Sequence, residues 1–88
     1  MARYEVYLKP SADRALKRLP VATQKRIVAR IDELGEDPRP SGVVKLVGGE
    51  NLWRIRVGGY RVLYEIHDDR LIVLVLRVAH RRDAYRGI

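Results

Sequence analysis

The sequence predicts an α+β fold, in which an N-terminal strand is followed by a two-helix hairpin packed on one face of a mainly antiparallel sheet of four or five strands. Three observations indicate this fold class. An alternating segment opens the chain, two amphipathic segments follow, and strand-like segments separated by short turns fill the second half. The helices cannot bury their apolar sides against each other alone, so they need a sheet to lie on.

The bulk properties indicate one soluble domain. The chain has 88 residues, enough for a single compact unit, and we assign residues 1–88 to one domain. It contains no cysteine, which excludes disulfides and cysteine-based metal sites and suits a reducing cytoplasm. The N-terminus is too poor in apolar residues for a signal peptide, and no apolar run approaches the roughly 18 residues of a membrane span. We therefore expect a cytoplasmic protein without a membrane partner.

The first strand and helix follow from the residues at positions 3 to 20. Residues 3–8 alternate, which predicts a half-buried strand that Pro10 ends. Its buried side carries Tyr4, Val6 and Leu8. Ser11 is a good N-cap for a short helix, and Pro20 stops that helix.

A second helix is expected from about Val21 to Leu34, with Gly35 as its C-terminal cap. Its predicted apolar stripe consists of Ile27, Val28, Ile31 and Leu34. Residues 36–42 read as a loop because of their proline, aspartate and glycine content. Strands are then expected at residues 43–47, the weakest of them, and at 52–57, 60–67 and 71–78.

The Gly58-Gly59 turn predicts a hairpin that places two arginines directly opposite each other. Its register pairs Val57 with Tyr60 and Arg56 with Arg61. Alternation then divides the hairpin into two faces. We call the side of Trp53, Ile55, Val57, Tyr60, Val62 and Tyr64 the helix face, and the side of Arg54, Arg56 and Arg61 the arginine face.

Opposed like charges destabilise a sheet by a few tenths of a kcal/mol to about 1 kcal/mol, so the arginine pair needs an explanation. One explanation is neutralisation by solvent or by a carboxylate such as Glu65. The other is an anion site for a phosphate, because the planar guanidinium fork binds phosphate oxygens bidentately and stays ionised. The formal net charge of +7 also favours a polyanionic partner, although a merely soluble basic surface would have the same charge.

The C-terminal segment "RVAHRRDAYRGI" at 77–88 adds a second cationic cluster. The strand before it runs antiparallel to residues 60–67, so the segment returns beside the Gly58-Gly59 turn. It contains His80, Arg81, Arg82, Tyr85 and Arg86. Arginines interleaved with tyrosine suit RNA, because cations bind phosphates and a ring stacks on unpaired bases. A basic tail is also compatible with a plain solvated surface.

The register of "LIVLVLRV" at 71–78 stays open because this run is apolar on both sides. With Asp68-Asp69 as the turn, Ile72, Leu74 and Leu76 share the arginine face and form an apolar floor. Alternatively, a bulge shifts the alternation.

Several segments together resemble the RelE branch of the RelE/ParE toxin superfamily over nearly the whole chain. They are the early strand, the helical hairpin, "KLVGG" at 45–49, "LWRIRVGGYRVLYEI" at 52–66 and "LRVAHRRDAYR" at 76–86. The resemblance implies a fold of the microbial ribonuclease type. It implies a toxin of a type II toxin–antitoxin system that cuts messenger RNA in the decoding site of the ribosome, and an antitoxin protein that wraps and blocks it.

The family chemistry implied is attack of the ribose 2′-hydroxyl on the adjacent phosphate, without a metal or other cofactor. By motif, Arg61 stabilises the transition-state phosphate, and Arg81 does likewise or assists the leaving group. Tyr85 stacks on a base or orients the nucleophile. RNA-phosphate binding is assigned to Arg54, Arg56, Lys45 and Arg82.

Arg54 and Arg56 stand where better-studied members of the family carry lysines. Arginine effectively cannot lose its proton, so these residues are poor general bases. His80 is the best-placed titrating group, because an ordinary imidazole titrates near neutrality. Two alternatives stay open: a DNA gyrase inhibitor of the ParE type that acts by binding, and a catalytically weakened antitoxin-binding module.

Overall fold

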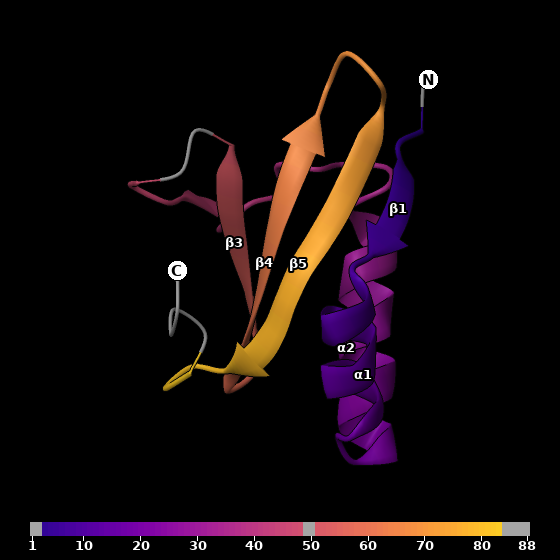
Figure 1. Cartoon of the computed structure of the whole chain (residues 1–88), viewed down its shortest axis with the longest axis vertical. Helices are drawn as coiled ribbons and strands as arrows, with labels where there is room; N and C mark the ends of the chain where they lie inside the picture. Colours follow the sequence, from indigo (N-terminus) through magenta and orange to yellow (C-terminus); the bar gives the residue numbers. More distant parts are fainter. Residues whose placement is uncertain (1–2, 49–50, 84–88) are drawn as a thin grey trace.

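The computed structural model describes residues 3–48 and 51–83. Along these residues the elements are β1 (Glu5–Leu8), α1 (Pro10–Lys17), α2 (Val21–Glu33), β2 (Val44–Lys45), β3 (Leu52–Val57), β4 (Tyr60–His67) and β5 (Ile72–His80). The strands form one sheet in the order β1-β5-β4-β3-β2, and both helices lie on the same side of it (Figure 1). The predicted α+β fold is confirmed. Neither helix in the described part of the chain is long and apolar enough to cross a membrane.

The sheet is a meander of antiparallel strands with one parallel edge. β2, β3, β4 and β5 pair antiparallel in sequence order, whereas β1 pairs in parallel with the first half of β5. A parallel neighbour needs a crossover connection, and the α1–α2 hairpin lies between β1 and the antiparallel strands along the chain. The early strand therefore lies at the sheet edge beside β5 rather than beside the segment that follows the helices.

The main hydrophobic core lies between the helices and the helix face. The sheet contributes Ile55, Val57, Val62, Tyr64, Ile66, Val73, Val75 and Val78, and the helical segment contributes Ala12, Leu16, Ile27, Ile31 and Leu34. Every one of these side chains is buried. The predicted helix face of the hairpin is thus confirmed where it meets the helices.

The start of α1 differs from the prediction. The helix begins at Pro10 with Lys9 as its N-cap, so Ser11 is inside the first turn and is not the cap. Proline suits the first helical position because its fixed φ matches the helix and its missing N–H would be unbonded there anyway. The backbone N–H of Lys9 donates to the Val75 carbonyl oxygen at 2.9 Å, which places the helix start against β5.

The end of α2 also corrects two expectations. Val28 is 48% exposed rather than part of the buried stripe, because Ile27, Ile31 and Leu34 recur on the side that meets the sheet. The C-cap is Leu34, and Gly35 follows it. Glycine is required there for close packing, since a Cβ at Gly35 would lie 3.0 Å from the Tyr4 carbonyl oxygen.

The strand bounds confirm the hairpin and modify its surroundings. β3 and β4 have the predicted bounds, 52–57 and 60–67. The last strand continues to His80 rather than ending at residue 78, and the weak strand at 43–47 is reduced to Val44–Lys45. The longer β5 matters for the site, because it carries the chain to the end of the β3–β4 hairpin.

A charged network ties the loop after α2 to the turn between β4 and β5. The Arg39 guanidinium binds the Asp68 carboxylate through two hydrogen bonds, of 3.1 and 2.8 Å. The Tyr4 hydroxyl donates to the same carboxylate at 2.5 Å. Beneath this network the buried Tyr64 hydroxyl donates to the Pro38 carbonyl oxygen at 2.7 Å. The Arg39 guanidinium and the Tyr4 hydroxyl lower the pKa of Asp68 from its ordinary value of 3.8 to about 2.

Replacing Asp68 by Asn should therefore destabilise the protein at neutral pH, and this destabilisation should disappear in acid. A lowered pKa in the folded state stabilises the protein above the ordinary pKa, and the contribution disappears as the pH falls from 3.8 to about 2. We expect the free energies of unfolding of wild type and D68N to converge in that interval. Urea unfolding at stepped pH measures this. Asp69, the exposed neighbour in the same turn, provides the control D69N, and parallel curves for D68N and wild type would contradict the prediction.

Candidate functional site

The β3–β4 hairpin has the predicted register and brings two arginines face to face. Arg56 pairs with Arg61 next to the turn, and Arg54 pairs with Leu63 two residues further along. Gly58 has a φ of +59°, a conformation that glycine adopts at no steric cost. The turn thus allows a tight hairpin, and the register of that hairpin places Arg56 opposite Arg61.

The arginines of this face are not equally exposed. Arg56 is exposed, whereas Arg54 and Arg61 are half-buried. The Nε atoms of Arg54 and Arg61 are themselves buried, so the protein encloses the inner part of both side chains. A side chain enclosed in this way loses less conformational freedom on binding a ligand than a freely rotating one does.

A β-bulge in β5 resolves the open register. Leu63 pairs with Arg77 and Tyr64 pairs with Val75, which leaves Leu76 as the extra residue. Before the bulge, Ile72 and Leu74 pair with residues of the arginine face. After it, the alternation is shifted by one residue. The first half of β5 therefore keeps the alternation predicted from the Asp68-Asp69 turn, and the second half has the alternation that a bulge shifts.

The bulge brings Arg77 onto the arginine face, and sequence reasoning did not assign this residue to the site. Arg77 pairs with Leu63, which is also the partner of Arg54, so the three residues form a row across β3, β4 and β5. The signal in the sequence was the pair of core valines Val75 and Val78, whose odd spacing is incompatible with an unbroken strand. Arg77 Nη1 donates a long hydrogen bond of 3.5 Å to the Asp83 carbonyl oxygen.

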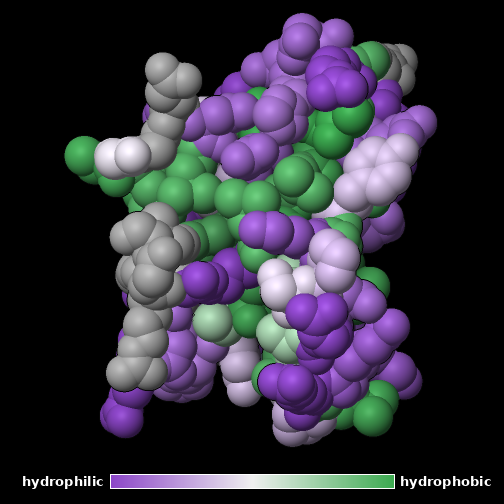
Figure 2. All heavy atoms as spheres, viewed as in Figure 1, coloured by the Kyte–Doolittle hydropathy of each residue, from purple (hydrophilic) through white to green (hydrophobic). Residues whose placement is uncertain are grey.

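An apolar floor lies on the arginine face, but of the expected residues Ile72, Leu74 and Leu76 only Leu76 belongs to its cluster. Leu52 and Leu63 are buried on this side of the sheet, with Leu46, Leu76 and Ala79 packed against them. Figure 2 shows apolar residues reaching the surface as a band between hydrophilic zones in this view. Charged side chains around an apolar floor are suited to a ligand with both phosphates and rings, because the floor accepts sugars and bases.

The segment after β5 returns to the hairpin turn, as predicted. The Arg81 N–H donates to the Gly59 carbonyl oxygen at 2.9 Å. The chain then turns, with the Asp83 N–H donating to the His80 carbonyl oxygen at 2.8 Å and the Arg82 N–H donating to His80 Nδ1 at 3.4 Å. Arg81 and Arg82 are both exposed in this turn. Tyr85 lies outside the described residues.

Two assigned residues do not share the arginine face. His80 pairs with Tyr60, and the two rings meet edge to face with centroids 5.6 Å apart, so the register places His80 on the side of Tyr60. Lys45 pairs with Trp53, and its Nζ lies 5.6 Å from the centroid of that ring. The Arg39 guanidinium lies 4.9 Å from the same centroid, so Lys45 belongs to a cation–π cluster around Trp53.

Glu65 pairs with a histidine at the far end of β4 from the arginine opposition. Its Oε1 atom lies 2.9 Å from His67 Nε2. Glu65 is the cross-strand partner of Leu52, two pairs away from Leu63 and four from Arg61. The described contacts of Glu65 therefore do not neutralise the Arg56–Arg61 pair.

Comparison with known proteins agrees with this architecture. The family described as "ParE toxin of type II toxin-antitoxin system, parDE" matches residues 6–85. The chain belongs to the RelE/ParE toxin superfamily. Its relatives include Toxin RelE3 of Methanocaldococcus jannaschii, to which it is 35% identical over 80% of this chain and 82% of the relative. It is 35% identical to Toxin RelG of Mycobacterium tuberculosis over 94% of this chain and 97% of the relative.

Solved RelE structures share the fold. The RelE–RelB complex of Pyrococcus horikoshii matches with a TM-score of 0.81 and 31% identity, over 93% of this chain and 99% of that one. The RelBE2 toxin–antitoxin complex of M. tuberculosis matches with a TM-score of 0.80 and 32% identity, over 94% and 97%. The protein is therefore a type II toxin of the RelE family.

The Arg56–Arg61 opposition should cost the RelE-family protein stability when no anion is bound. Replacing Arg56 by Thr removes the repulsion and supplies a β-branched strand residue, so we expect the free energy of unfolding to rise by about 0.5 kcal/mol at low salt. Urea unfolding at low and high salt measures this, and the gain should shrink as salt screens the charges.

Arg56→Lys is the matched control, because it keeps a positive charge opposite Arg61 and should stay within error of wild type. An R56T variant less stable than wild type at low salt would show that the pair is not repulsive in the folded protein.

Proposed function

We propose that this toxin is an endoribonuclease that cleaves messenger RNA in the decoding site of the ribosome. The observation that carries the proposal is the cluster of Arg54, Arg56 and Arg61 on an open, apolar-floored face, with the Arg81 turn hydrogen-bonded to the same hairpin. Membership in the RelE family supports it. Such a protein would work in the cytoplasm, where ribosomes engage messages.

The proposed reaction is attack of a ribose 2′-hydroxyl on the adjacent phosphorus. A bond forms between the 2′-oxygen and phosphorus, the bond to the 5′-oxygen breaks, and the products are a 2′,3′-cyclic phosphate and a 5′-hydroxyl end. Negative charge builds up on the non-bridging oxygens in the transition state. Arg56 and Arg61 supply opposed guanidinium groups for that charge, and fixed cations at such a position are often the largest electrostatic contribution to a rate.

Arg81 is proposed to meet the same phosphate from the end of β5, which lies beside the β3–β4 turn. Its backbone N–H donates to the Gly59 carbonyl oxygen at 2.9 Å, so its side chain starts beside the β3–β4 turn. From there it can neutralise the phosphate or assist the departing 5′-oxygen, as the family motif implies. The role of Tyr85, stacking or orienting the nucleophile, stays a prediction.

The antitoxin is the proposed protein partner. The matched structures from P. horikoshii and M. tuberculosis are toxin–antitoxin complexes. We propose that a co-encoded antitoxin binds this chain and covers its arginine face or its C-terminal segment, which would deny the site to RNA. Co-expression should yield a stable complex without nuclease activity.

Gyrase inhibition is the second candidate, because the matched family description names the ParE toxin. The two functions have different effects on induction. Messenger cleavage should halt translation and leave cuts inside ribosome-bound messages that primer extension detects. Gyrase poisoning should instead produce DNA breaks and an SOS response.

Replacing Arg61 or Arg81 by Ala should abolish cleavage by removing a cation from the transition-state charge. We expect the rate on programmed ribosomes to fall by about 100- to 1,000-fold, with the far-ultraviolet circular dichroism spectrum unchanged. Because Arg61 is half-buried, Arg61→Lys is a second variant that keeps charge and packing but loses the planar fork. Arg14→Ala, an exposed change on α1, is the control and should cut normally. Normal cutting by R61A and R81A would refute the site.

The assignment of His80 as the general base stays a prediction, and the structure adds a second role, since His80 Nδ1 accepts the Arg82 N–H and its carbonyl accepts the Asp83 N–H. Asn places an acceptor near the Nδ1 position but does not titrate, so His80→Asn separates the two roles. A general base contributes about 100-fold or more to such a rate, so we expect H80N to cut roughly 100-fold more slowly and to lose the low-pH decline in kcat/KM. Cleavage within about tenfold of wild type with an unchanged pH profile would instead leave His80, beside Tyr60, with the structural role alone.

A further inference from the structure

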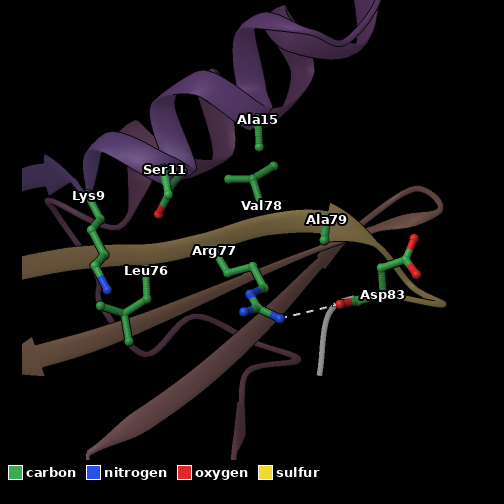
Figure 3. Close-up of a pocket in the computed structure, with 9 residues that line it drawn as sticks. Lys9, Ser11, Ala15, Leu76, Arg77, Val78, Ala79 and Asp83 are labelled. Carbon is green, nitrogen blue, oxygen red and sulfur yellow. Dashed lines mark hydrogen bonds between the residues drawn. The ribbon is translucent and has the colours of Figure 1, made fainter. Parts of the chain in front are cut away.

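A groove between α1 and β5 continues the arginine face around the edge of the sheet. β1 pairs only with Ile72 to Val75 of β5, so the strand edge beyond Val75 lies open beside the start of α1. The groove there has a volume of about 480 Å³. Lys9 and Ser11 line it from the α1 side, and Leu76 and Arg77 line it from β5 (Figure 3).

The two cations of the groove lie on the same side of β5. Figure 3 shows the side chains of Lys9 and Arg77 extending in the same direction, with Leu76 between them. Asp83 also lines the groove; the Arg77 guanidinium contacts its carbonyl oxygen, and its carboxylate points away from Arg77 (Figure 3). The groove therefore combines Lys9, Arg77 and Asp83 with an apolar wall formed in part by Ala12 and Ala15.

We propose that Lys9 and Arg77 form a second phosphate subsite, which binds the RNA linkage next to the one that is cleaved. The proposal rests on the proposed nuclease function. Neighbouring strands lie about 4.8 Å apart, so three strand steps place Lys9, beyond β5, at least about 14 Å from Arg56 on β3, which is more than one phosphate spans. Arg77 connects the two groups, because it belongs to the Arg54–Leu63–Arg77 row and also lines the groove.

The chemistry of the groove favours an RNA backbone over base readout. Lys9 supplies a point charge and Arg77 a planar fork, and both bind phosphate without reading sequence. The small side chains of Ala12 and Ala15 leave room for a sugar. The subsite would hold the message in line with the Arg56–Arg61 pair, so that the correct linkage reaches the catalytic arginines.

The test combines a protein variant with a chemical change in the message. A methylphosphonate removes the charge of a single linkage, placed one position 5′ or 3′ of the cleaved one. Single-turnover cleavage on programmed ribosomes is measured with wild type, with the double variant K9Q/R77Q and with K25Q/R70Q. The last is the charge-matched control, because Lys25 on α2 and Arg70 in the β4–β5 turn are exposed and do not line the groove.

For wild type and the control we expect the methylphosphonate at one of the two positions to slow cleavage by roughly tenfold. K9Q/R77Q should cut the normal message slowly and show no further loss with the modified one. An equal methylphosphonate effect in K9Q/R77Q and wild type would overturn the proposal. Unchanged cleavage together with weaker binding of the co-encoded antitoxin would overturn it as well, and would reassign the groove to the protein partner.

If the proposed nuclease function is wrong, the result differs from loss of the subsite, because wild type would then cut no message on ribosomes. In that case, binding of a fluorescent oligoribonucleotide without ribosomes tests whether the groove binds an RNA phosphate. Each lost phosphate contact lowers the slope of log K against log salt by about one. A smaller slope for K9Q/R77Q would support the subsite without the nuclease, and a slope equal to that of wild type would overturn it.

Discussion

The site depends on the direct opposition of Arg56 and Arg61 across the β3–β4 hairpin. Two guanidinium groups in register repel each other, and the sheet tolerates this because β3 and β4 bury apolar residues on the opposite side. Tyr64, Ile55 and Val62 are almost fully buried there. The packing of the helices against the helix face thus supports a charge arrangement that the arginine face would not favour by itself. An anion on that face would turn the repulsion into a shared binding site.

The bulge at Leu76 allows one strand to contribute to both sides of the sheet. Val73, Val75 and Val78 of β5 enter the main core, whereas Arg77 reaches the arginine face. In an unbroken strand, Val75 and Val78 would point to opposite sides, and either the core or the cationic row would lose a member. Bulges commonly occur next to functional sites, where they redirect a side chain. Here the bulge joins the hairpin arginines to the groove beside α1.

Structural and candidate functional cations are spatially separated in this small domain. Arg39 binds Asp68 and lies against the Trp53 ring, which Lys45 also approaches. These contacts hold the loop after α2 over the sheet. Arg56, Arg61, Arg77 and Arg81 instead belong to the arginine face or to the turn that meets its hairpin. The basic residues behind the net charge of +7 therefore include two groups with different roles.

The sequence by itself determined the fold class, the hairpin and the arginine opposition, because alternation, helical spacing and a Gly-Gly turn are local signals. It also indicated that the C-terminal segment returns to the turn. The tertiary structure alone decided the parallel pairing of β1 with β5, the face of Arg77 and the placement of His80 beside Tyr60. An apolar run such as 71–76 carries no alternation, so its register depends on which residues the helices bury, and that is a long-range property.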